Sequence, residues 1–149
     1  MQEKFELTST LFPKLTEEEA KIVFTEQRAF EADRLVFAEG DGGDGAYFIL
    51  DGRAKAVTFS TGHREIALGE LNKGEVFGEM ALIDDRPRSA SIVTISPCEV
   101  AYITKKGFNK FIDTRSELAY RLISFICLSI FRRILRLDKV YADIKTVFS

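Results

Sequence analysis

A short segment from Phe77 to Ser91 combines a glycine, a carboxylate, a brief apolar turn and an arginine. Gly78 has no Cβ atom, so a ligand can approach its backbone closely. Glu79 offers two acceptor oxygens to a hydroxyl group, and Glu79 to Ile83 can form one helical turn whose free N–H groups point at an anion. Arg88 adds a planar set of donors that matches the oxygens of a phosphate. Together these residues predict a site for a sugar with a phosphate fused onto it.

Two of these residues also have plainer interpretations. A single arginine is more often a surface charge than a ligand, and an acid at the start of a helix is favoured by the helix dipole alone. Arg88 and Glu79 therefore indicate an anion site only when they are taken together and with the sequence pattern around them.

Short strand-like runs lie on both sides of this segment, from Arg28 to Leu71 and from Ile92 to Ile103. The stretch from Glu39 to Gly45 has four glycines in seven positions, which predicts a loop. Asp51-Gly52 predicts a two-residue turn that joins two paired strands in a hairpin. Roughly eight short strands, spaced about ten residues apart, predict a small barrel or jelly roll.

Helical patterns occupy the two ends of the chain. Thr16 to Glu19 forms a capping box for a short helix that is expected to end near Gln27. Ser116 precedes a longer helix, expected from Glu117 to about Thr146. Within this helix, Glu117 and Arg121 have the spacing of an ion pair on a solvated face.

The long helix has more apolar surface than one packing partner requires. One apolar stripe runs from Leu118 to Leu135 and a second from Ile123 to Ile144. A helix that packs on a single partner needs an apolar arc of about 100°. We therefore expect one side to pack on the strands and the other on a second helix, from a second copy of the chain.

Length and composition are those of an ordinary globular domain. The chain has 149 residues, of which 46% are hydrophobic and 30% charged, and its formal net charge is −2. The near-neutral charge argues against a general nucleic-acid binder, which usually has a marked basic excess. We expect a single domain over residues 1–149, with a helical part at 1–27, strands at 28–103 and helices at 104–149.

Targeting and redox signals are weak. The N-terminus, Met1 to Lys4, lacks the layout of a signal peptide. The longest uncharged apolar run, Leu122 to Phe131, is far shorter than the roughly 20 residues of a membrane span. We therefore expect a cytoplasmic protein. Cys98 and Cys127 have no metal or CxxC spacing and are predicted to be reduced thiols in the core.

Residues suited to catalysis are sparse. His63 is the only histidine, and it follows Gly62 in a predicted turn. The neighbouring acids Asp84 and Asp85 are expected to close the helical turn or to pair with Arg86. Hydrolysis of a phosphate diester would need metal ligands that the chain lacks. We expect no enzyme activity, no metal and no resident cofactor.

Three separated blocks match the pattern of a known family in order and spacing: Glu39 to Gly52, Gly74 to Leu82, and Arg86 to Ser91. In these blocks the chain resembles the cyclic nucleotide-binding domain. That family includes bacterial catabolite-activator regulators, regulatory subunits of cyclic-AMP-dependent kinase and cyclic-nucleotide-gated channels. The resemblance covers about residues 11 to 145. It implies an α+β fold, an eight-stranded, jelly-roll-like β-roll with a short N-terminal helix, a phosphate-binding cassette at 77–91 and C-terminal helices.

The resemblance also implies a role for each residue of the cassette. Backbone donors would come from Gly78 to Ala81, and Glu79 would accept the ribose 2′-hydroxyl. Arg88 would pair with the cyclic phosphate, while Ser89 and Ala90 would complete the anion site. The predicted ligand-binding residues are Phe77, Gly78, Glu79, Met80, Ala81, Arg88, Ser89 and Ala90.

The family resemblance leaves the base and the output less defined. We expect cyclic AMP (cAMP) in preference to cyclic GMP (cGMP), although Ser89 lies where cGMP-selective kinase domains of the family carry threonine. The long helix, near Leu122 to Ile130, is expected to cap the base and to move when the nucleotide binds. An alternative is a degenerate member of the fold that acts in dimerisation or interaction without binding a nucleotide.

We expect the resemblance to the bacterial regulators and kinase subunits to stop at the long helix, without their helix-turn-helix domain or second nucleotide site. The chain is either a stand-alone sensor or a piece whose output domain lies elsewhere. We expect a protein effector of unknown identity and no direct contact with nucleic acid. Arg132, Arg133, Arg136 and Lys139 form a basic group, interpreted as a solvated face rather than a surface for an acidic partner or a membrane.

Overall fold

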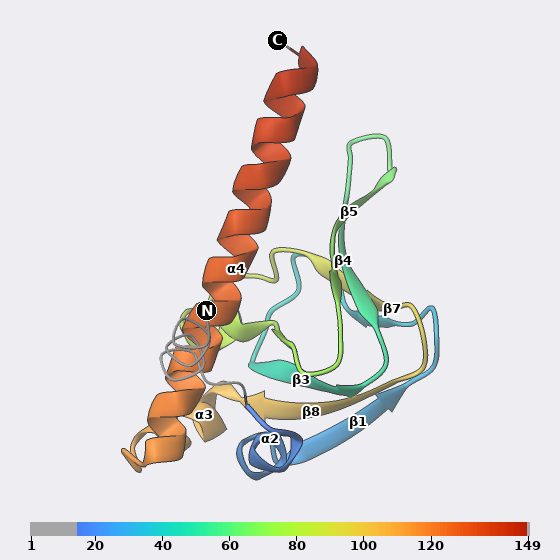
Figure 1. Cartoon of the computed structure of the whole chain (residues 1–149). Helices are drawn as coiled ribbons and strands as arrows, with labels where there is room; N and C mark the ends of the chain where they lie inside the picture. Colours follow the sequence, from blue (N-terminus) through green and yellow to red (C-terminus); the bar gives the residue numbers. More distant parts are fainter. Residues whose placement is uncertain (1–14, 149) are drawn as a thin grey trace, which may run out of the picture.

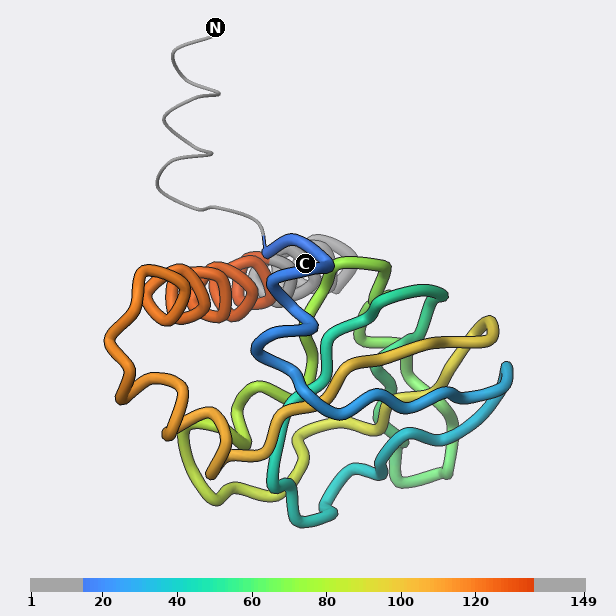
Figure 2. The backbone as a smooth tube through the Cα atoms, turned by 90° about the horizontal axis from the view of Figure 1, so that it is seen from below, coloured from blue at the N-terminus to red at the C-terminus, as the bar shows by residue number. Residues whose placement is uncertain are grey.

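The chain folds into a roll of two antiparallel sheets with helices on one side (Figures 1 and 2). The computed structural model describes residues 15–148, with side chains described for residues 15–135. The first sheet has the strand order β1-β8-β3-β6 and the second the order β2-β7-β4-β5. The elements are α2 (Glu17–Val23), β1 (Glu26–Phe30), β2 (Leu35–Phe37), β3 (Gly45–Asp51), β4 (Ala54–Phe59), β5 (Glu65–Leu71), β6 (Val76–Phe77), η1 (Glu79–Leu82), β7 (Ser91–Thr94), β8 (Cys98–Thr104), α3 (Lys105–Ile112) and α4 (Glu117–Phe148). The predicted eight-stranded β-roll with flanking helices is confirmed.

Strand β3 is buried on both faces, which explains its continuous apolar sequence. Successive side chains of a strand point to opposite faces of the sheet. Tyr47 and Ile49 point into the core between the two sheets, and Phe48 and Leu50 point into a second core under α2 and α4. The first sheet is therefore a shared wall between the roll interior and the helical layer.

The long helix α4 is anchored on this wall by its first half. Leu122 is fully buried, and Phe125 and Ile126 lie beside it in the core that also contains Phe24, just after α2, and Phe48 of β3. At about 25 cal/mol per Å² of buried apolar surface, each such side chain contributes roughly 1.5–3 kcal/mol. This packing fixes where the next turns of α4 lie relative to the roll.

An ion pair joins α4 to the N-terminal helix α2. Arg121 Nη2 donates a hydrogen bond to Glu19 Oε1 at 3.2 Å, and Nη1 donates to the other carboxylate oxygen. Burial opposes ionisation of Glu19, but hydrogen bonds from Thr16 and Arg121 outweigh it and hold the pKa of this carboxyl below its ordinary value. Thr16 and Glu19 form the predicted capping box. Arg121 thus connects α4 to the N-terminal helix, an interaction that the spacing of Glu117 and Arg121 in the sequence does not indicate.

The predicted hairpin at Asp51-Gly52 is wrong, although a tight turn is present. Gly52 has φ of 91°, and a Cβ atom there would lie 2.2 Å from the carbonyl oxygen of Pro97. Both edges of β3 are already occupied, because β8 pairs along one and β6 along the other. The chain therefore crosses to the second sheet, where β4 pairs with β5 and β7.

Two further expectations need correction. Helix α2 ends at Val23 instead of near Gln27, because Phe24 is extended and buried and the chain then enters β1 at Glu26. Of the two cysteines, Cys98 is buried as expected, but Cys127 is exposed on α4. No helix in the described part of the chain is long and apolar enough to cross a membrane.

Candidate functional site

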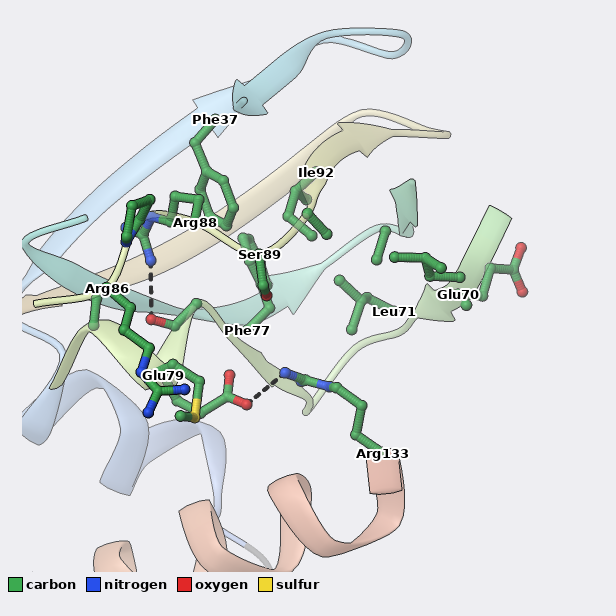
Figure 3. A pocket seen from close by; sticks show the side chains of 18 residues that line it. Phe37, Glu70, Leu71, Phe77, Glu79, Arg86, Arg88, Ser89, Ile92 and Arg133 are labelled. Carbon is green, nitrogen blue, oxygen red and sulfur yellow. Dashed lines mark hydrogen bonds and ion pairs between the residues drawn. The ribbon is translucent and has the colours of Figure 1, made fainter. Parts of the chain in front are cut away.

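A cavity of about 420 Å³ opens between η1, the segment that follows it, strand β5 and α4 (Figure 3). Pockets for small organic ligands usually have about 300–1,000 Å³. The structure brings all the predicted ligand-binding residues to the wall of this cavity: Phe77, Gly78, Glu79, Met80, Ala81, Arg88, Ser89 and Ala90.

Glu79 is the first residue of η1, and its side chain is completely buried. Gly78 before it has φ of 71°, a conformation that favours glycine and that turns the chain sharply from β6 into η1. Oε1 of Glu79 accepts a hydrogen bond from Nη1 of Arg133 on α4 at 2.5 Å. Oε2 has no hydrogen-bond partner among the described residues. One acceptor oxygen of a buried carboxylate is therefore available to a ligand.

Arg88 is also buried, with 8% of its surface exposed. Nη1 donates to the carbonyl oxygen of Gly78 at 2.9 Å, and Nη2 donates to that of Gly45 at 2.8 Å. The guanidinium carbon lies 4.1 Å from the centre of the Phe37 ring, a cation–π contact. Nε has no hydrogen-bond partner in the described part of the chain. Arg88 is thus oriented by two backbone carbonyls while one of its donors stays unused.

Two glycines leave the space that Arg88 occupies. A Cβ atom on Gly43 would lie 2.6 Å from the Arg88 guanidinium, and a Cβ atom on Gly78 would lie 2.6 Å from its Nη1. These distances are too short for any side chain, so the glycine-rich loop and the start of η1 close around this arginine. The four-glycine stretch of the sequence is explained in part by this close approach.

The opposite wall of the cavity is apolar. It includes Leu68 and Leu71 of β5, Ala56 of β4 and Ile92 of β7. The register of β4 and β5 shifts between the pairs Ala56–Gly69 and Val57–Ala67, which leaves Leu68 as the additional residue of a β-bulge. Bulges redirect side chains, and here Leu68 faces the cavity. The flat ring of a base would find its apolar contacts on this wall.

Arg133 lies at the cavity, although the sequence pattern places it with Arg132 on a solvated basic face. It is half-buried, lines the cavity and also donates to the carbonyl oxygen of Val76 at 3.4 Å. Arg132 is exposed as expected. The side chains of Arg136 and Lys139 lie outside the described residues. One signal could have separated Arg133 from Arg132 in advance: a buried carboxylate such as that of Glu79 needs a cation within reach.

The stretch from Leu122 to Ile130, predicted to cap the base when a nucleotide binds, lies away from the cavity, and its role in the bound state stays a prediction. None of these described residues lines the cavity, because the buried ones pack on the first sheet. Helix α4 reaches the cavity later, at Arg133. The acids after η1 pair as one alternative foresaw: Asp84 with Arg86 at 2.9 Å, while Asp85 pairs with Lys105 of α3 at 2.9 Å.

The fold and the cavity define a class of protein, and sequence comparison agrees. A family model for the cyclic nucleotide-binding domain matches residues 27–115, more than half of the chain. The chain therefore belongs to the cyclic nucleotide-binding domain family.

Two sequence relatives, a bacterial receptor protein and a fungal kinase regulatory subunit, carry cAMP in their names. The chain is 28% identical to the cyclic AMP receptor protein of Thermus thermophilus over 132 residues, which cover 87% of this chain and 61% of that protein. It is 36% identical to a cAMP-dependent protein kinase regulatory subunit of Aspergillus niger over 92 residues, covering 62% of this chain and 22% of the subunit. The chain thus spans less than two thirds of the length of either relative.

Among solved structures, the c-di-GMP responsive global regulator CLP of Xanthomonas campestris is similar in fold. The TM-score is 0.77 at 25% sequence identity, and the match covers 84% of this chain and 61% of that one. The names of these three proteins mention two different kinds of cyclic nucleotide.

Proposed function

We propose that this chain is a sensor that binds cAMP in the cavity, in preference to cGMP, and transmits binding through α4. One observation carries the proposal: two buried groups of opposite charge, Glu79 and Arg88, line the same cavity and each keeps an atom without a partner among the described residues. A buried polar atom left without a hydrogen bond costs about 1–3 kcal/mol. A ligand that satisfies both atoms recovers this cost.

A cyclic nucleotide has the groups that these two atoms need. Its ribose 2′-hydroxyl can donate to Oε2 of Glu79, and its phosphate oxygens can accept from Nε of Arg88. The backbone N–H groups at the start of η1 are further donors for the phosphate. Hydrogen bonds to charged groups contribute about 1.5–3 kcal/mol each. These contacts would orient the ligand, with its base toward the apolar wall that includes Leu68 and Leu71.

Support for cAMP comes from the apolar character of this wall and from the names of the two sequence relatives. An adenine presents fewer polar groups that need partners than a guanine does. Ser89 lines the cavity, and under the rival cGMP assignment its hydroxyl would contact a guanine amino group. Comparing both nucleotides on wild type and Ser89→Ala separates the two: a cAMP sensor keeps its preference in the variant.

The proposed transmission depends on the contact between Glu79 and Arg133. Because Glu79 belongs to the predicted phosphate-binding cassette and Arg133 to α4, a ligand that engages Glu79 changes the environment of a charge on the helix. Two positions of α4 that differ in this ion pair would then have different affinities for the nucleotide. Ligand binding would shift the population between them.

We also propose that α4 joins two copies of the chain. Its outer face carries exposed residues at intervals of three and four positions: Tyr120, Ile123, Cys127, Phe131 and Ile134. The inner face packs on the roll, so these exposed residues form a second apolar surface on the helix. Of the second stripe that the sequence predicts, Ile123 belongs to this surface, whereas Ile126 is buried against the roll. A parallel pair of α4 helices would cover the stripe and couple two nucleotide sites.

The proposed output is regulation of a protein effector, without nucleotide hydrolysis and in the cytoplasm. The names of the two sequence relatives describe a receptor and a regulatory subunit, which supports binding without chemistry. The rival proposal, a degenerate domain with a disused pocket, predicts no nucleotide binding at all. The intact charge pair in the cavity, Glu79 and Arg88, favours a working site over this rival.

Isothermal titration calorimetry tests the function directly. Wild type is titrated with cAMP, cGMP and cyclic di-GMP, and then Glu79→Gln and Arg88→Lys with the preferred nucleotide. We expect cAMP to bind most tightly, and each variant to lose about tenfold or more in affinity while remaining folded by circular dichroism. No heat with any of the three nucleotides on folded wild type would reject the proposal in favour of the disused pocket.

A further inference from the structure

Behind the glycine-rich loop lies a polar cluster that does not line the cavity: Arg28 of β1, Asp44 of the loop, Tyr47 of β3 and Tyr102 of β8. Arg28 lies over the Tyr102 ring, 4.1 Å from its centre, and donates to the Tyr47 hydroxyl at 3.1 Å. The Tyr102 hydroxyl donates to Oδ1 of Asp44. Strands β1, β3 and β8 are neighbours in the first sheet, so this cluster rests on a rigid platform.

Tyr102 is suited to act as a permanent donor. Its side chain is buried, with 2% of its surface exposed. Burial, followed by the hydrogen bond to Asp44 and the charge of this carboxylate, raises the pKa of the Tyr102 phenol well above its ordinary value. The hydroxyl therefore keeps its proton throughout the physiological range and continues to hold the Asp44 carboxylate.

The residue after Asp44 connects this cluster to the anion site. A Cβ atom on Gly45 would lie 2.6 Å from the Tyr102 hydroxyl and 2.1 Å from the carbonyl oxygen of Ile103, so β8 closes one side of this glycine. On its other side, the carbonyl oxygen of Gly45 accepts the 2.8 Å hydrogen bond from Nη2 of Arg88. The carbonyl oxygen of Asp44 accepts from the N–H of Lys105 at 2.6 Å. The short Asp44-Gly45 segment is thus held between β8 and Arg88.

We propose that Tyr102 is a positioning residue of the nucleotide site, which orients Arg88 through Asp44 and Gly45 without touching the ligand. The chain of contacts runs from the Tyr102 hydroxyl to the Asp44 carboxylate, and from the adjoining Gly45 carbonyl to the guanidinium of Arg88. The inference rests on the proposed function, because it assigns to Arg88 the task of binding the cyclic phosphate. It adds a residue on β8 that nothing in the phosphate-binding segment itself indicates.

The test is Tyr102→Phe, which removes one hydroxyl and keeps the ring that packs against Tyr47 at 4.7 Å and under Arg28. The matched control is Tyr47→Phe, which removes the other hydroxyl of the same cluster, whose hydrogen-bond partner in the described part of the chain is Arg28. We expect the dissociation constant for cAMP to rise about five- to tenfold in Tyr102→Phe and to stay within about twofold in Tyr47→Phe. Asp44→Asn, which keeps an acceptor oxygen, should lose less affinity than Asp44→Ala.

A second readout separates positioning from general stability. In ligand-free protein, hydrogen exchange of the Arg88 Nε–H group, followed by ¹⁵N NMR, should be faster in Tyr102→Phe and unchanged in Tyr47→Phe. This measurement needs no ligand, so it tests the positioning role even if wild type binds no nucleotide and the proposed function fails. Unchanged exchange and affinity in folded Tyr102→Phe, or equal losses in both tyrosine variants, would overturn the inference.

Discussion

Replacing Arg133 by methionine removes the ion-pair partner that the described structure gives to the buried Glu79 carboxylate. Methionine retains a similar length and apolar stem on α4, so the substitution removes mainly the charge and the donors. The stability of this variant therefore measures how strongly the ion pair between α4 and the cavity stabilises the protein without a ligand.

The expected magnitude follows from the different exposure of the two side chains. Glu79 is 0% exposed and Arg133 42% exposed, so only one of the two charges is fully desolvated. Removing one partner of a fully buried pair costs about 3–5 kcal/mol, whereas fully exposed pairs contribute about 0–1 kcal/mol. For this asymmetric pair we expect Arg133→Met to lower the free energy of unfolding by about 1–3 kcal/mol. Glu79→Gln should cost less, because Arg133 can then reach water.

Urea unfolding followed by circular dichroism, at one protein concentration, measures this in a double-mutant cycle. Arg133→Met, Glu79→Gln and the double variant are compared with wild type, and we expect a coupling energy of about 1–2 kcal/mol. Arg132→Met is the control, since this exposed neighbour should change stability by no more than about 0.5 kcal/mol. Additivity of the two substitutions within about 0.3 kcal/mol would refute the argument that this pair links α4 to the cavity.

Three further predictions concern other parts of the molecule. Because the pKa of Glu19 is lowered in the fold from its reference value of 4.5, its charged form contributes stability above this pH and loses that contribution as the pH falls through the folded value. The difference in melting temperature between wild type and Glu19→Gln, which keeps the capping geometry but weakens the pair with Arg121, should therefore shrink on acidification below pH 4.5. Gly78→Ala forces a Cβ atom toward Arg88 and strains a positive φ, so it should weaken cAMP binding about tenfold and destabilise the fold by about 1–2 kcal/mol. Mild oxidation should cross-link two copies through Cys127 if α4 pairs in parallel, and Cys127→Ser should prevent this.

Each of these has a result that counts against it. A Glu19→Gln difference that is constant from pH 7 to pH 3 would mean that the ionised form has no special role. Wild-type affinity in Gly78→Ala, measured by calorimetry, would show that the Arg88 guanidinium can move without loss. A chain that sediments as a monomer at micromolar concentration, with and without cAMP, would remove the proposed α4 pairing.

Much of the fold could be predicted because local chemistry specifies it. The Thr16–Glu19 capping box, the glycine loop and the turn at Ser60 to His63 depend on residues adjacent in sequence. The predicted ligand-binding residues, which lie between Phe77 and Ala90, also line one cavity, since they are close along the chain. Such features need no knowledge of distant contacts.

The failures concern choices that only the assembled sheets decide. Asp51-Gly52 favours a tight turn in any context, but whether β4 pairs with β3 depends on which strands already occupy the edges of β3. A strand at each edge leaves no room for a third, so the local hairpin preference loses to the sheet topology.

The positions of Arg133 and Cys127 depend on the assembled fold for a related reason. On α4 they differ from their neighbours only in rotation about the helix axis, and both faces of this helix carry apolar residues. Which face turns toward the roll is decided by the packing of Leu122 and Phe125 on the first sheet. That packing directs Arg133 to the cavity and leaves Cys127 exposed.

A crystal structure of the chain with cAMP is the most direct test of the central claim, that the cavity beside η1 is a cyclic nucleotide site. We predict the ribose 2′-hydroxyl within hydrogen-bond distance of Oε2 of Glu79, a phosphate oxygen within that distance of Nε of Arg88, and the base against Leu68 and Leu71. A nucleotide bound elsewhere, or a cavity that stays empty in crystals grown with saturating cAMP, would contradict the account.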